Sequence, residues 1–490
     1  MTERMVFVLA APAQSRKSEA VNPNIFREYD IRGVADRDLT DELTESIGRA
    51  YHAMLAEHDG ARKLRIAVGR DGRVSGPRLH AALVRGLVQA GAHVIDVGIG
   101  PTPMLYFAVH HLGADGGIMI TGSHNPGDEN GFKMMKGKAS FFGPDIVTLR
   151  DRIANGDLGP TGAGQIESID VRVPYIEALT RDIVVREKNM KVVLDAGNGS
   201  GGPLGVEALR KVGLAPAELF CEIDGTFPNH HPDPTVPKNL EALIEKVRES
   251  GAQVGLAFDG DADRLGAVDA DGTIVWGDKL LILFARALLK KRPGATVIGE
   301  VKCSQTLYDD VAAKGGTPLM WKTGHSLIKT KMKETGALLA GEMSGHLFFA
   351  DRYFGYDDAL YAALRLIEIL SEEGMTMSEL LADVPETCTT PEIRVDCPDE
   401  AKFAVVRGVL ERYRARLGSD AVPKPHSVDD TDGARISFGK PGAPAWGLVR
   451  ASNTGPILVL RFEAPTVADL FAIRTDVESA VAEERAKLGL

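Results

Sequence analysis

A strand–helix alternation recurs three times along this chain and limits its fold more than any other feature. Each repeat opens with a buried strand that runs into a polar loop, and the openings are LRIAVGRDGR from Leu64, KVVLDAGNGSGG from Lys191 and TVIGEVKCS from Thr296. A helix, a second strand (HVIDVG, AELFCEID or PLMWKTGH), another helix and a third strand follow each opening. This alternation predicts sheets covered on both faces by helices, with right-handed connections wherever the strands are parallel.

The predicted helices carry one apolar face. In GPRLHAALVRGLVQAGA, the residues Leu79, Leu83 and Leu87 recur at four-residue intervals, which places them on one side of a helix. The segment NLEALIEKVRESG shows the same pattern and ends at Gly251, a residue type that terminates helices.

The pattern changes after about Pro385. The segments CTTPEIRVDCPDE, ARISF and ILVLRFEA alternate like half-buried strands, and TVADLFAIRTDVESAVAEERAKL reads as a closing helix. We therefore predict the α/β class, with three similar α/β/α sandwich domains that have mixed sheets and a smaller C-terminal α+β domain around a central cleft. The expected domain limits are 1–170, 171–273, 274–385 and 386–490, and 490 residues are enough for four such cores.

The composition excludes several classes of partner. A net charge of −11 argues against a surface for nucleic acid or anionic membrane, so an anionic ligand needs a local cluster of cations. The four cysteines show no C-x-x-C metal spacing and are expected to be free thiols. No apolar run approaches a membrane span, and the run 5–11 is too short for a signal peptide. These features favour the cytoplasm.

The third strand of each repeat ends in a polar loop: GGIMITGSHNP, QVGLAFDGDADR or ALLAGEMSGH. Open α/β sheets bind ligands beyond the carboxyl ends of their strands, so three such loops can converge on one cleft. The first loop presents Ser123 beside His124, and a serine needs a neighbouring base or a stored electrophile to react. The hydrolase pattern G-x-S-x-G is not met, because Asn125 replaces the second glycine. Taken alone, a serine in such a turn is most often an ordinary turn residue, so this loop by itself decides nothing.

The second loop indicates a metal site. Asp259, Asp261 and Asp263 alternate, so in an extended chain their carboxylates would face one side. Close carboxylates repel one another unless a hard cation such as Mg²⁺ or Ca²⁺ joins them. A calcium hand is excluded, because Arg264 and Ala270 occupy the places of its glycine and glutamate. A solvated acidic turn is the competing interpretation.

Polar residues of the third and fourth loops suit a phosphosugar. Glu342, Ser344 and His346 alternate in GEMSGH, and such side chains can bind sugar hydroxyls. Shortly before them, His325 is a possible proton carrier. In VRASNTGP, the cation of Arg450 precedes three short donors, a combination that fits a phosphate. A simple turn remains the alternative for both loops.

A dinucleotide fingerprint competes with these loops. KVVLDAGNGSGG matches G-x-G-x-x-G at Gly197, Gly199 and Gly202, and Glu222 ends the next strand. However, Asp195 would stand beside a pyrophosphate, and a dehydrogenase would leave the other loops unexplained. We therefore disfavour this interpretation.

The loops TGSHNP, DGDADR, GEMSGH and RASNTGP, in this order, resemble the four signature loops of the α-D-phosphohexomutase superfamily. Within it, the chain is most similar to the bacterial phosphomannomutase/phosphoglucomutase branch. The resemblance begins at IFREYDIRG and covers nearly the whole chain. It implies three α/β domains and a smaller fourth around a deep cleft, and a phosphoserine enzyme that requires Mg²⁺.

The resemblance also implies roles for single residues. Ser123 would be the phosphorylated serine, and its phosphate would hold Mg²⁺ together with Asp259, Asp261 and Asp263. The implied catalytic residues are Ser123, His124, Lys133, Arg32, His325 and Arg264. The implied substrate-binding residues are Tyr29, Lys302, Glu342, Ser344, His346, Arg450, Ser452, Asn453 and Thr454. The general acid and base stay open among Lys133, His325 and Arg32.

The implied reaction is the reversible interconversion of hexose 1-phosphate and hexose 6-phosphate by an intramolecular phosphotransferase of the isomerase class. It would run through a hexose 1,6-bisphosphate, with glucose 1,6-bisphosphate or mannose 1,6-bisphosphate as activator. The partners would be small phosphosugars, with no nucleic acid and no membrane. The oligomeric state stays open, with a monomer favoured.

One position bears on the choice of sugar. Phosphoglucosamine mutases typically carry glutamine where Met343 stands, so the resemblance favours mannose and glucose phosphates. A phosphoglucosamine mutase, a Mg²⁺-dependent sugar phosphatase and a non-catalytic phosphosugar-binding protein remain as alternatives.

Overall fold

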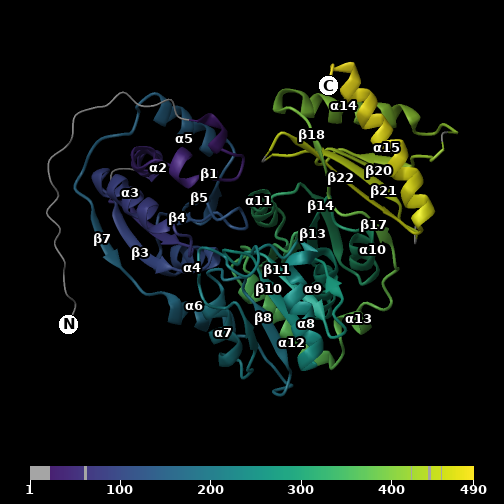
Figure 1. The fold of residues 1–490 in the computed structure, drawn as a ribbon, viewed down its shortest axis with the longest axis horizontal. Helices are drawn as coiled ribbons and strands as arrows, with labels where there is room; N and C mark the ends of the chain where they lie inside the picture. The colour runs from purple at the N-terminus through teal and green to yellow at the C-terminus, as the bar shows by residue number, and fades with distance from the viewer. Residues whose placement is uncertain (1–21, 60–62, 421, 440–442, 454) are drawn as a thin grey trace.

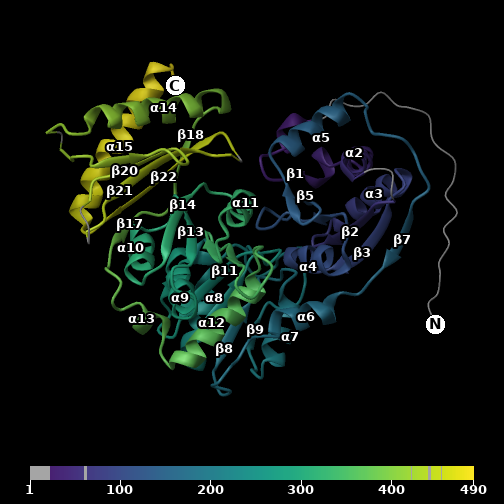
Figure 2. The ribbon, with the colours of Figure 1, turned by 180° about the vertical axis from the view of Figure 1, so that it is seen from behind.

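The structure is a computed structural model that describes residues 22–59, 63–420, 422–439, 443–453 and 455–490. Within these residues the strands form four sheets that follow one another along the chain. Figure 1 shows the first sheet and the C-terminal sheet on opposite sides of helix α11 (His325–Thr335), with the second and third sheets between them along the chain. The same arrangement is seen from behind in Figure 2.

The first sheet has the strand order β1-β5-β4-β2-β3-β7, with β6 beside β5. Its strands are β1 (Ile31–Val34), β2 (Arg65–Arg70), β3 (His93–Ile99), β4 (Gly116–Ile120), β5 (Glu129–Lys136), β6 (Ala139–Phe141) and β7 (Gln165–Ser168). The helices of this region are η1 (Pro23–Ile25), α1 (Ala35–Asp38), α2 (Asp41–Asp59), α3 (Gly76–Gln89), α4 (Thr102–Leu112) and α5 (Pro144–Ala154). Ile66 and Val68 of β2 face the cluster that includes α2 and α3, whereas Ala67 faces the cluster that includes α4. Helices thus cover both faces.

The second and third sheets have the orders β12-β11-β10-β8-β9 and β14-β13-β15-β16. The second region contains β8 (Val192–Asp195), β9 (Ala217–Leu219), β10 (Val254–Phe258), β11 (Leu265–Asp269), β12 (Ile274–Val275), α6 (Arg172–Thr180), α7 (Gly202–Lys211), η2 (Pro237–Leu240) and α8 (Glu241–Ser250). The third contains β13 (Thr296–Glu300), β14 (Thr317–Trp321), β15 (Leu339–Gly341), β16 (Leu347–Phe349), α9 (Gly277–Lys291), α10 (Gln305–Ala313), α11, α12 (Ala359–Glu373) and α13 (Met377–Leu380).

The predicted repeat is present as a shared topology. The matching strand orders are β3-β2-β4-β5, β9-β8-β10-β11 and β14-β13-β15-β16. In each, the first three strands of the repeat are parallel and the fourth is antiparallel to the third. Each polar loop therefore joins the third strand of its repeat to an antiparallel fourth strand, which places the three loops at equivalent positions.

The predicted apolar helix faces are confirmed. Leu79, Leu83 and Leu87 are fully buried, and α8 ends at Gly251, whose φ of 60° is left-handed. One apolar cluster runs through the first three regions and includes Leu105 of α4. This shared core fixes the first three sheets relative to one another.

The C-terminal region has the predicted α+β build. Its sheet has the order β17-β22-β21-β20-β19, with β18 also beside β22, and all of its pairings are antiparallel. The elements are β17 (Cys388–Thr389), β18 (Ile393–Asp396), β19 (Ser427–Asp429), β20 (Ala434–Ser437), β21 (Trp446–Ala451), β22 (Ile457–Ala464), α14 (Asp399–Arg416) and α15 (Val467–Lys487). Both helices join the sheet in a separate apolar core. None of the helices in the described part of the chain is both long and apolar enough to serve as a membrane span.

Candidate active site

Three polar loops meet beyond the carboxyl ends of β4, β10 and β15. We call them the serine loop (residues 121–128), the acidic loop (residues 259–264) and the glutamate loop (residues 342–346). The serine and acidic loops are joined by Ser123, whose Oγ donates to Asp259 Oδ2 over 2.9 Å. The acidic and glutamate loops are joined by a backbone bridge between Arg264 and His346. The structure thus brings together loops that are far apart in sequence, since Ser123 and Asp259 are 136 residues apart and Arg264 and His346 are 82 residues apart.

Ser123 is held in a conformation that few serines adopt. Its φ of 49° lies in the left-handed region, and its N–H donates to Thr121 Oγ1 over 2.8 Å. The side chain is buried, and Oγ lies 3.0 Å from His124 Nδ1 as well as beside Asp259. Burial and the nearby charges of Arg264 and Arg32 lower the pKa of His124 well below its usual value, so this imidazole is neutral.

The acidic loop gathers three carboxylates that are fully buried. Ligand atoms of Asp259, Asp261 and Asp263 lie within 4.8 Å of one another. Burial and then repulsion by Asp263 and Asp261 raise the pKa of Asp259 well above its usual value. Burial acts in the same direction on Asp261, but the attraction of Lys133 outweighs it and lowers the pKa of Asp261. A single ammonium group therefore offsets only part of the negative charge.

The carboxylates converge through a turn, which corrects the prediction of an extended segment. Ala262 has a left-handed φ of 53°, and Asp259 Oδ1 accepts the N–H groups of Asp263 and Arg264 over 3.0 and 3.1 Å. The side chain of Asp259 thus closes the turn.

The donor set fits a hard divalent cation. Among the described residues, Asp261 Oδ1 and Asp263 Oδ1 are buried without a hydrogen-bond partner, although Lys133 Nζ lies 2.6 and 2.5 Å from their Oδ2 atoms. Buried carboxylate oxygens without donors are costly unless a cation takes them as ligands. The acidic loop is therefore a candidate metal-binding site in its ligand chemistry and its geometry.

Cations from two other elements surround the serine. Lys133 comes from β5, and Arg32 comes from β1, where its Nε donates to Asp30 Oδ2 over 2.7 Å and its Nη1 to Asn125 Oδ1 over 3.0 Å. Arg264 belongs to the acidic loop and donates from Nε to His346 Nε2 over 3.0 Å. The predicted cations thus lie around the serine and acidic loops.

The glutamate loop faces the N-terminus of α11. Glu342 Oε1 accepts the N–H of Gly324 over 2.6 Å, and Ser344 Oγ donates to Glu342 Oε2 over 3.2 Å. The rings of His325 and His346 stack with centroids 5.5 Å apart. Burial and then the charge of Lys329 lower the pKa of His325 well below its usual value, so this histidine is neutral.

Tyr29 links the first, third and fourth regions. Its hydroxyl donates to the carbonyl oxygen of Thr323 over 2.9 Å and accepts from Asn453 Nδ2 over 2.7 Å. Asn453 lies in the C-terminal loop (residues 450–454), where Arg450 Nε donates to Asp432 Oδ2 over 3.0 Å.

Three predicted residues remain, of which the structure describes two. Lys302 Nζ lies 3.2 Å from Glu392 Oε2, at the junction of the third and fourth regions, and Ser452 is buried in the C-terminal loop. Thr454, which the sequence analysis also assigned to this loop, lies outside the described residues.

Four models of one protein family match consecutive parts of this chain. They are described as the phosphoglucomutase/phosphomannomutase alpha/beta/alpha domains I, II and III and the C-terminal domain, and they match residues 23–158, 173–272, 276–388 and 392–480. The chain belongs to this family. The α-D-phosphohexomutase resemblance is therefore confirmed.

Individual relatives align with this chain over nearly their whole lengths. A "Phosphomannomutase/phosphoglucomutase" of Pseudomonas aeruginosa is 46% identical over 460 residues, which are 94% of this chain and 96% of the relative. A "Phosphoglucomutase" of Neisseria meningitidis is 44% identical, over 94% of this chain and 96% of the relative. The crystal structure of a phosphoglucomutase/phosphomannomutase family protein from Burkholderia thailandensis superposes with a TM-score of 0.86 at 43% identity, covering 95% of this chain and 98% of the other.

The glycine-rich segment that competes as a dinucleotide fingerprint packs against other loops of this phosphohexomutase. A Cβ at Gly199 would lie 2.8 Å from the carbonyl oxygen of Gly260, and one at Gly202 would lie 2.2 Å from that of Cys221. Asp195 pairs with His230, whose Nε2 lies 3.0 Å from Oδ1. The glycines thus permit close backbone approach to protein, including the acidic loop.

Sequence reasoning missed two buried charged residues of the site. Arg73, in the loop after β2, donates to backbone carbonyls of the serine loop. Asp357 lies 3.0 Å from His346 Nδ1 and 3.0 Å from Lys329 Nζ. The segment GRDGR at the end of the first strand was a signal for Arg73, whereas no local pattern distinguishes Asp357.

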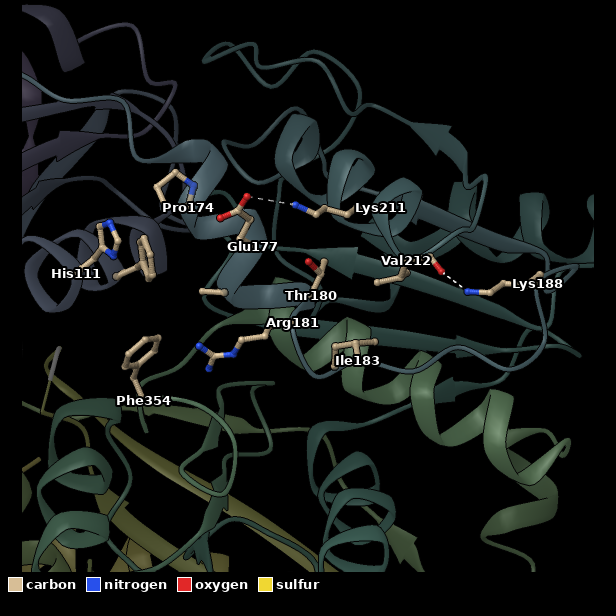
Figure 3. A pocket seen from close by; sticks show the side chains of 12 residues that line it. His111, Pro174, Glu177, Thr180, Arg181, Ile183, Lys188, Lys211, Val212 and Phe354 are labelled. Atoms are coloured by element: carbon tan, nitrogen blue, oxygen red, sulfur yellow. Dashed lines mark hydrogen bonds and ion pairs between the residues drawn. The ribbon is translucent and has the colours of Figure 1, made fainter.

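A surface cavity lies apart from these loops (Figure 3). It has a volume of about 730 Å³ and is lined by residues of α4, α6 and α7 and by Phe354. Glu177 and Lys211 approach each other to 4.0 Å in its wall. None of the predicted site residues that the structure describes lines this cavity, and its described wall residues include no cluster of buried carboxylates.

Proposed function

We propose that this phosphohexomutase interconverts hexose 1-phosphates and hexose 6-phosphates of mannose, glucose or both through a phosphorylated Ser123. The observation that carries the proposal is the contact of 2.9 Å between Ser123 Oγ and Asp259 Oδ2 at the junction of the serine and acidic loops. It is supported by the names of relatives that are 46% and 44% identical to the chain.

Asp259, Asp261 and Asp263 are the residues that would hold Mg²⁺, with an oxygen of the phosphate on Ser123 as a further ligand. Bound Mg²⁺ supplies positive charge that neutralises the phosphoryl group during transfer. Lys133 stays protonated between Asp261 and Asp263, because their attraction outweighs burial and raises the pKa of Lys133. Phosphoryl transfer needs alignment and charge neutralisation more than covalent chemistry from the protein, and these buried groups provide both.

The reaction consists of two transfers in opposite directions. Phospho-Ser123 gives its phosphoryl group to a hexose 1-phosphate, which becomes the 1,6-bisphosphate. The bisphosphate turns over, and its other phosphoryl group returns to Ser123. Arg450, Ser452, Asn453 and Thr454 would bind the phosphate that is not reacting, and Glu342, Ser344 and His346 would bind sugar hydroxyls. Glucose or mannose 1,6-bisphosphate restores the phosphoenzyme if the intermediate escapes.

Of the three candidates for proton transfer, His325 is the one that is uncharged and so has a ring nitrogen free of its proton. Its pKa is lowered by burial, so the ring is neutral. Lys133 has a raised pKa and stays charged, and Arg32 is a guanidinium that does not titrate in this range. His325 also packs edge-on against Tyr29, with ring centroids 5.9 Å apart, which fixes its orientation on the substrate side.

The choice of sugar rests on Met343, which replaces the glutamine typical of phosphoglucosamine mutases. We further propose a monomer of four domains, with limits at 170, 273 and 385, that works in the cytoplasm.

Phosphorus NMR tests the function directly. The purified protein is given Mg²⁺ and a trace of glucose 1,6-bisphosphate, with mannose 1-phosphate, glucose 1-phosphate or glucosamine 1-phosphate in parallel tubes. We expect 6-phosphates from the first two sugars and little from the third. Inorganic phosphate alone would indicate a phosphatase, and no conversion in any tube would favour a binding protein. Ser123→Ala should abolish conversion with the fold intact.

A further inference from the structure

We infer that Arg73 is a positioning residue that sets the place of the Ser123 backbone relative to the metal-binding carboxylates. The inference rests on the proposed function, because it concerns the efficiency with which phospho-Ser123 delivers its phosphoryl group to a sugar. Arg73 contributes no atom to the reaction.

Arg73 supplies donors to four backbone carbonyl groups in the serine loop and at the start of β5. Its Nη2 donates to the carbonyl oxygens of Ser123 and Asn125 over 2.8 and 2.6 Å. Its Nη1 donates to those of Pro126 and Glu129 over 2.5 and 2.9 Å. One guanidinium thus binds four carbonyls within seven residues, and it does so from a different segment of the chain.

The guanidinium is itself held in place by contacts from two other segments. The Arg73 side chain is fully buried, and Nε lies 3.3 Å from Asp71 Oδ2. Asp71 also accepts the N–H of Arg73 through Oδ1 over 2.9 Å and the N–H of Gly122 through Oδ2 over 3.3 Å. The ring of Phe227, from the second region, covers the guanidinium with its centroid 5.2 Å away. A buried charge with this many partners has one low-energy position.

This position is transmitted to the acidic loop through the Ser123 carbonyl. A Cβ at Gly260 would lie 2.3 Å from the Ser123 carbonyl oxygen, and a Cβ at Gly122 would lie 2.5 Å from Arg73 Cζ. The peptide group of Ser123 therefore lies between the Arg73 guanidinium and the backbone of the acidic loop. The distance from Ser123 Oγ to Asp259 depends on the position of this peptide group.

Loss of the Arg73 guanidinium should slow phosphoryl transfer to a sugar more than phosphoryl transfer to water. A hydroxyl of a bound sugar must line up with the phosphorus–Oγ bond, and small displacements of reacting groups cost about 100-fold in rate. Water must also attack in line with this bond, but a free water molecule can move to the displaced phosphoryl group, whereas a bound sugar cannot. In the competing reaction, a water oxygen bonds to phosphorus, the phosphorus–Oγ bond breaks, and one proton of the water ends on Oγ, so that serine and inorganic phosphate are left.

The test compares Arg73→Lys with Arg78→Lys. Lysine keeps the charge but lacks the planar fork that reaches several carbonyls at once. Arg78 is a matched control, because it also donates to backbone carbonyls, those of Leu39 and Ala35 over 3.1 and 2.8 Å, but in contact with α2 and α1 rather than with the serine loop. Protein labelled with radioactive phosphate on Ser123 is mixed with Mg²⁺ and glucose 1-phosphate. The amounts of label in sugar phosphate and in inorganic phosphate are then measured.

We expect Arg73→Lys to raise the ratio of inorganic phosphate to sugar phosphate at least tenfold and to lower kcat about 100-fold, with Arg78→Lys within twofold of the unsubstituted protein. The ratio does not depend on how much protein is folded, so it remains informative if Arg73→Lys is less stable. A ratio within twofold for Arg73→Lys, or an equal change in Arg78→Lys, would overturn the inference. If Ser123→Ala takes up the same label, the proposed function fails instead.

Discussion

At the scale of single residues, the site is dominated by three carboxylates that repel one another. Asp259, Asp261 and Asp263 are fully buried, and only Lys133 contacts two of them among the described cations. The folded protein without metal therefore retains electrostatic strain in the acidic loop, as the raised pKa of Asp259 indicates. A cation that binds the folded state relieves this strain and stabilises the fold by mass action.

We expect Mg²⁺ at about 100 times its dissociation constant to stabilise the protein by about 2.7 kcal/mol, which raises the midpoint of thermal unfolding by several degrees. Asp261→Asn should remove most of this increase, because it deletes a ligand. Differential scanning calorimetry, carried out with Mg²⁺ and with EDTA, measures this increase in the unfolding midpoint. Asp269→Asn is a suitable control, since this buried carboxylate caps α13 by accepting from Met377 and Ser378; an equal loss there would contradict the assignment.

A second residue pair makes stability depend on pH. His230 Nε2 lies 3.0 and 3.1 Å from the two oxygens of Asp195, and Nδ1 lies 2.9 Å from the carbonyl oxygen of His231. Burial opposes the imidazolium, but the hydrogen bond and charge of Asp195 outweigh it, so the pKa of His230 is raised. The stabilisation is then complete below the unfolded pKa of about 6.5 and is lost as the pH rises through the folded pKa.

We therefore expect His230→Gln to lower the free energy of unfolding at pH 6 by roughly 0.5–1 kcal/mol, a value that allows for solvent screening, and by less at pH 9. Urea unfolding of both proteins at the two pH values gives the comparison. A loss at pH 9 that equals or exceeds the loss at pH 6 would show that charge on His230 does not contribute.

At the scale of elements, the site is made by equivalent loops in three sheets of the same topology. The glutamate loop depends on Gly345, whose φ of 92° is left-handed and whose added Cβ would lie 2.4 Å from the carbonyl oxygen of Leu265. This close approach holds the glutamate loop against β11, at the end of the acidic loop. The spacing between the two loops is therefore set by backbone contact.

Replacing Gly345 with alanine should force these loops apart. We expect Gly345→Ala to raise the KM for the sugar phosphate about tenfold, equivalent to about 1.4 kcal/mol, because Glu342 and Ser344 shift with the loop. Steady-state kinetics measure the change. Gly336→Ala is the control, since Gly336 has a φ of 68° but no atom within 4 Å of its added Cβ. Equal effects of the two substitutions would point to backbone strain alone.

The elements were largely predictable, and the conformation of the loops was not. The spacing of Leu79, Leu83 and Leu87 defined α3 because a helix places every fourth residue on one face. The turn in the acidic loop escaped prediction, because its left-handed Ala262 is stabilised by the Asp259 side chain and by tertiary contacts. Arg73 escaped as well, since its partners lie about 50 residues further along the chain.

At the scale of the whole molecule, the site closes through contacts that sequence patterns do not report. The Tyr29 hydroxyl reaches Thr323 and Asn453, which are 294 and 424 residues away. These bonds connect the first region to the third and to the C-terminal region, which has a core of its own. Because its core is separate, we expect the C-terminal region to move as a unit, with Tyr29 among the contacts that hold it to the first region.

Tyr29→Phe removes only this hydroxyl and should favour opening of the C-terminal region. Two hydrogen bonds of about 1 kcal/mol each are lost, so we expect kcat/KM to fall about 5- to 30-fold and more of the phosphoryl group to reach water. Small-angle X-ray scattering should show a larger radius of gyration for the variant without ligand. Tyr413→Phe is the matched control, because the Tyr413 hydroxyl donates to Asp476 over 2.7 Å within the C-terminal region. If both variants keep the original radius of gyration and the original division of the phosphoryl group, closure does not depend on Tyr29. Contacts such as those of Lys302 with Glu392 and of Arg435 with the Cys303 carbonyl oxygen then hold the C-terminal region.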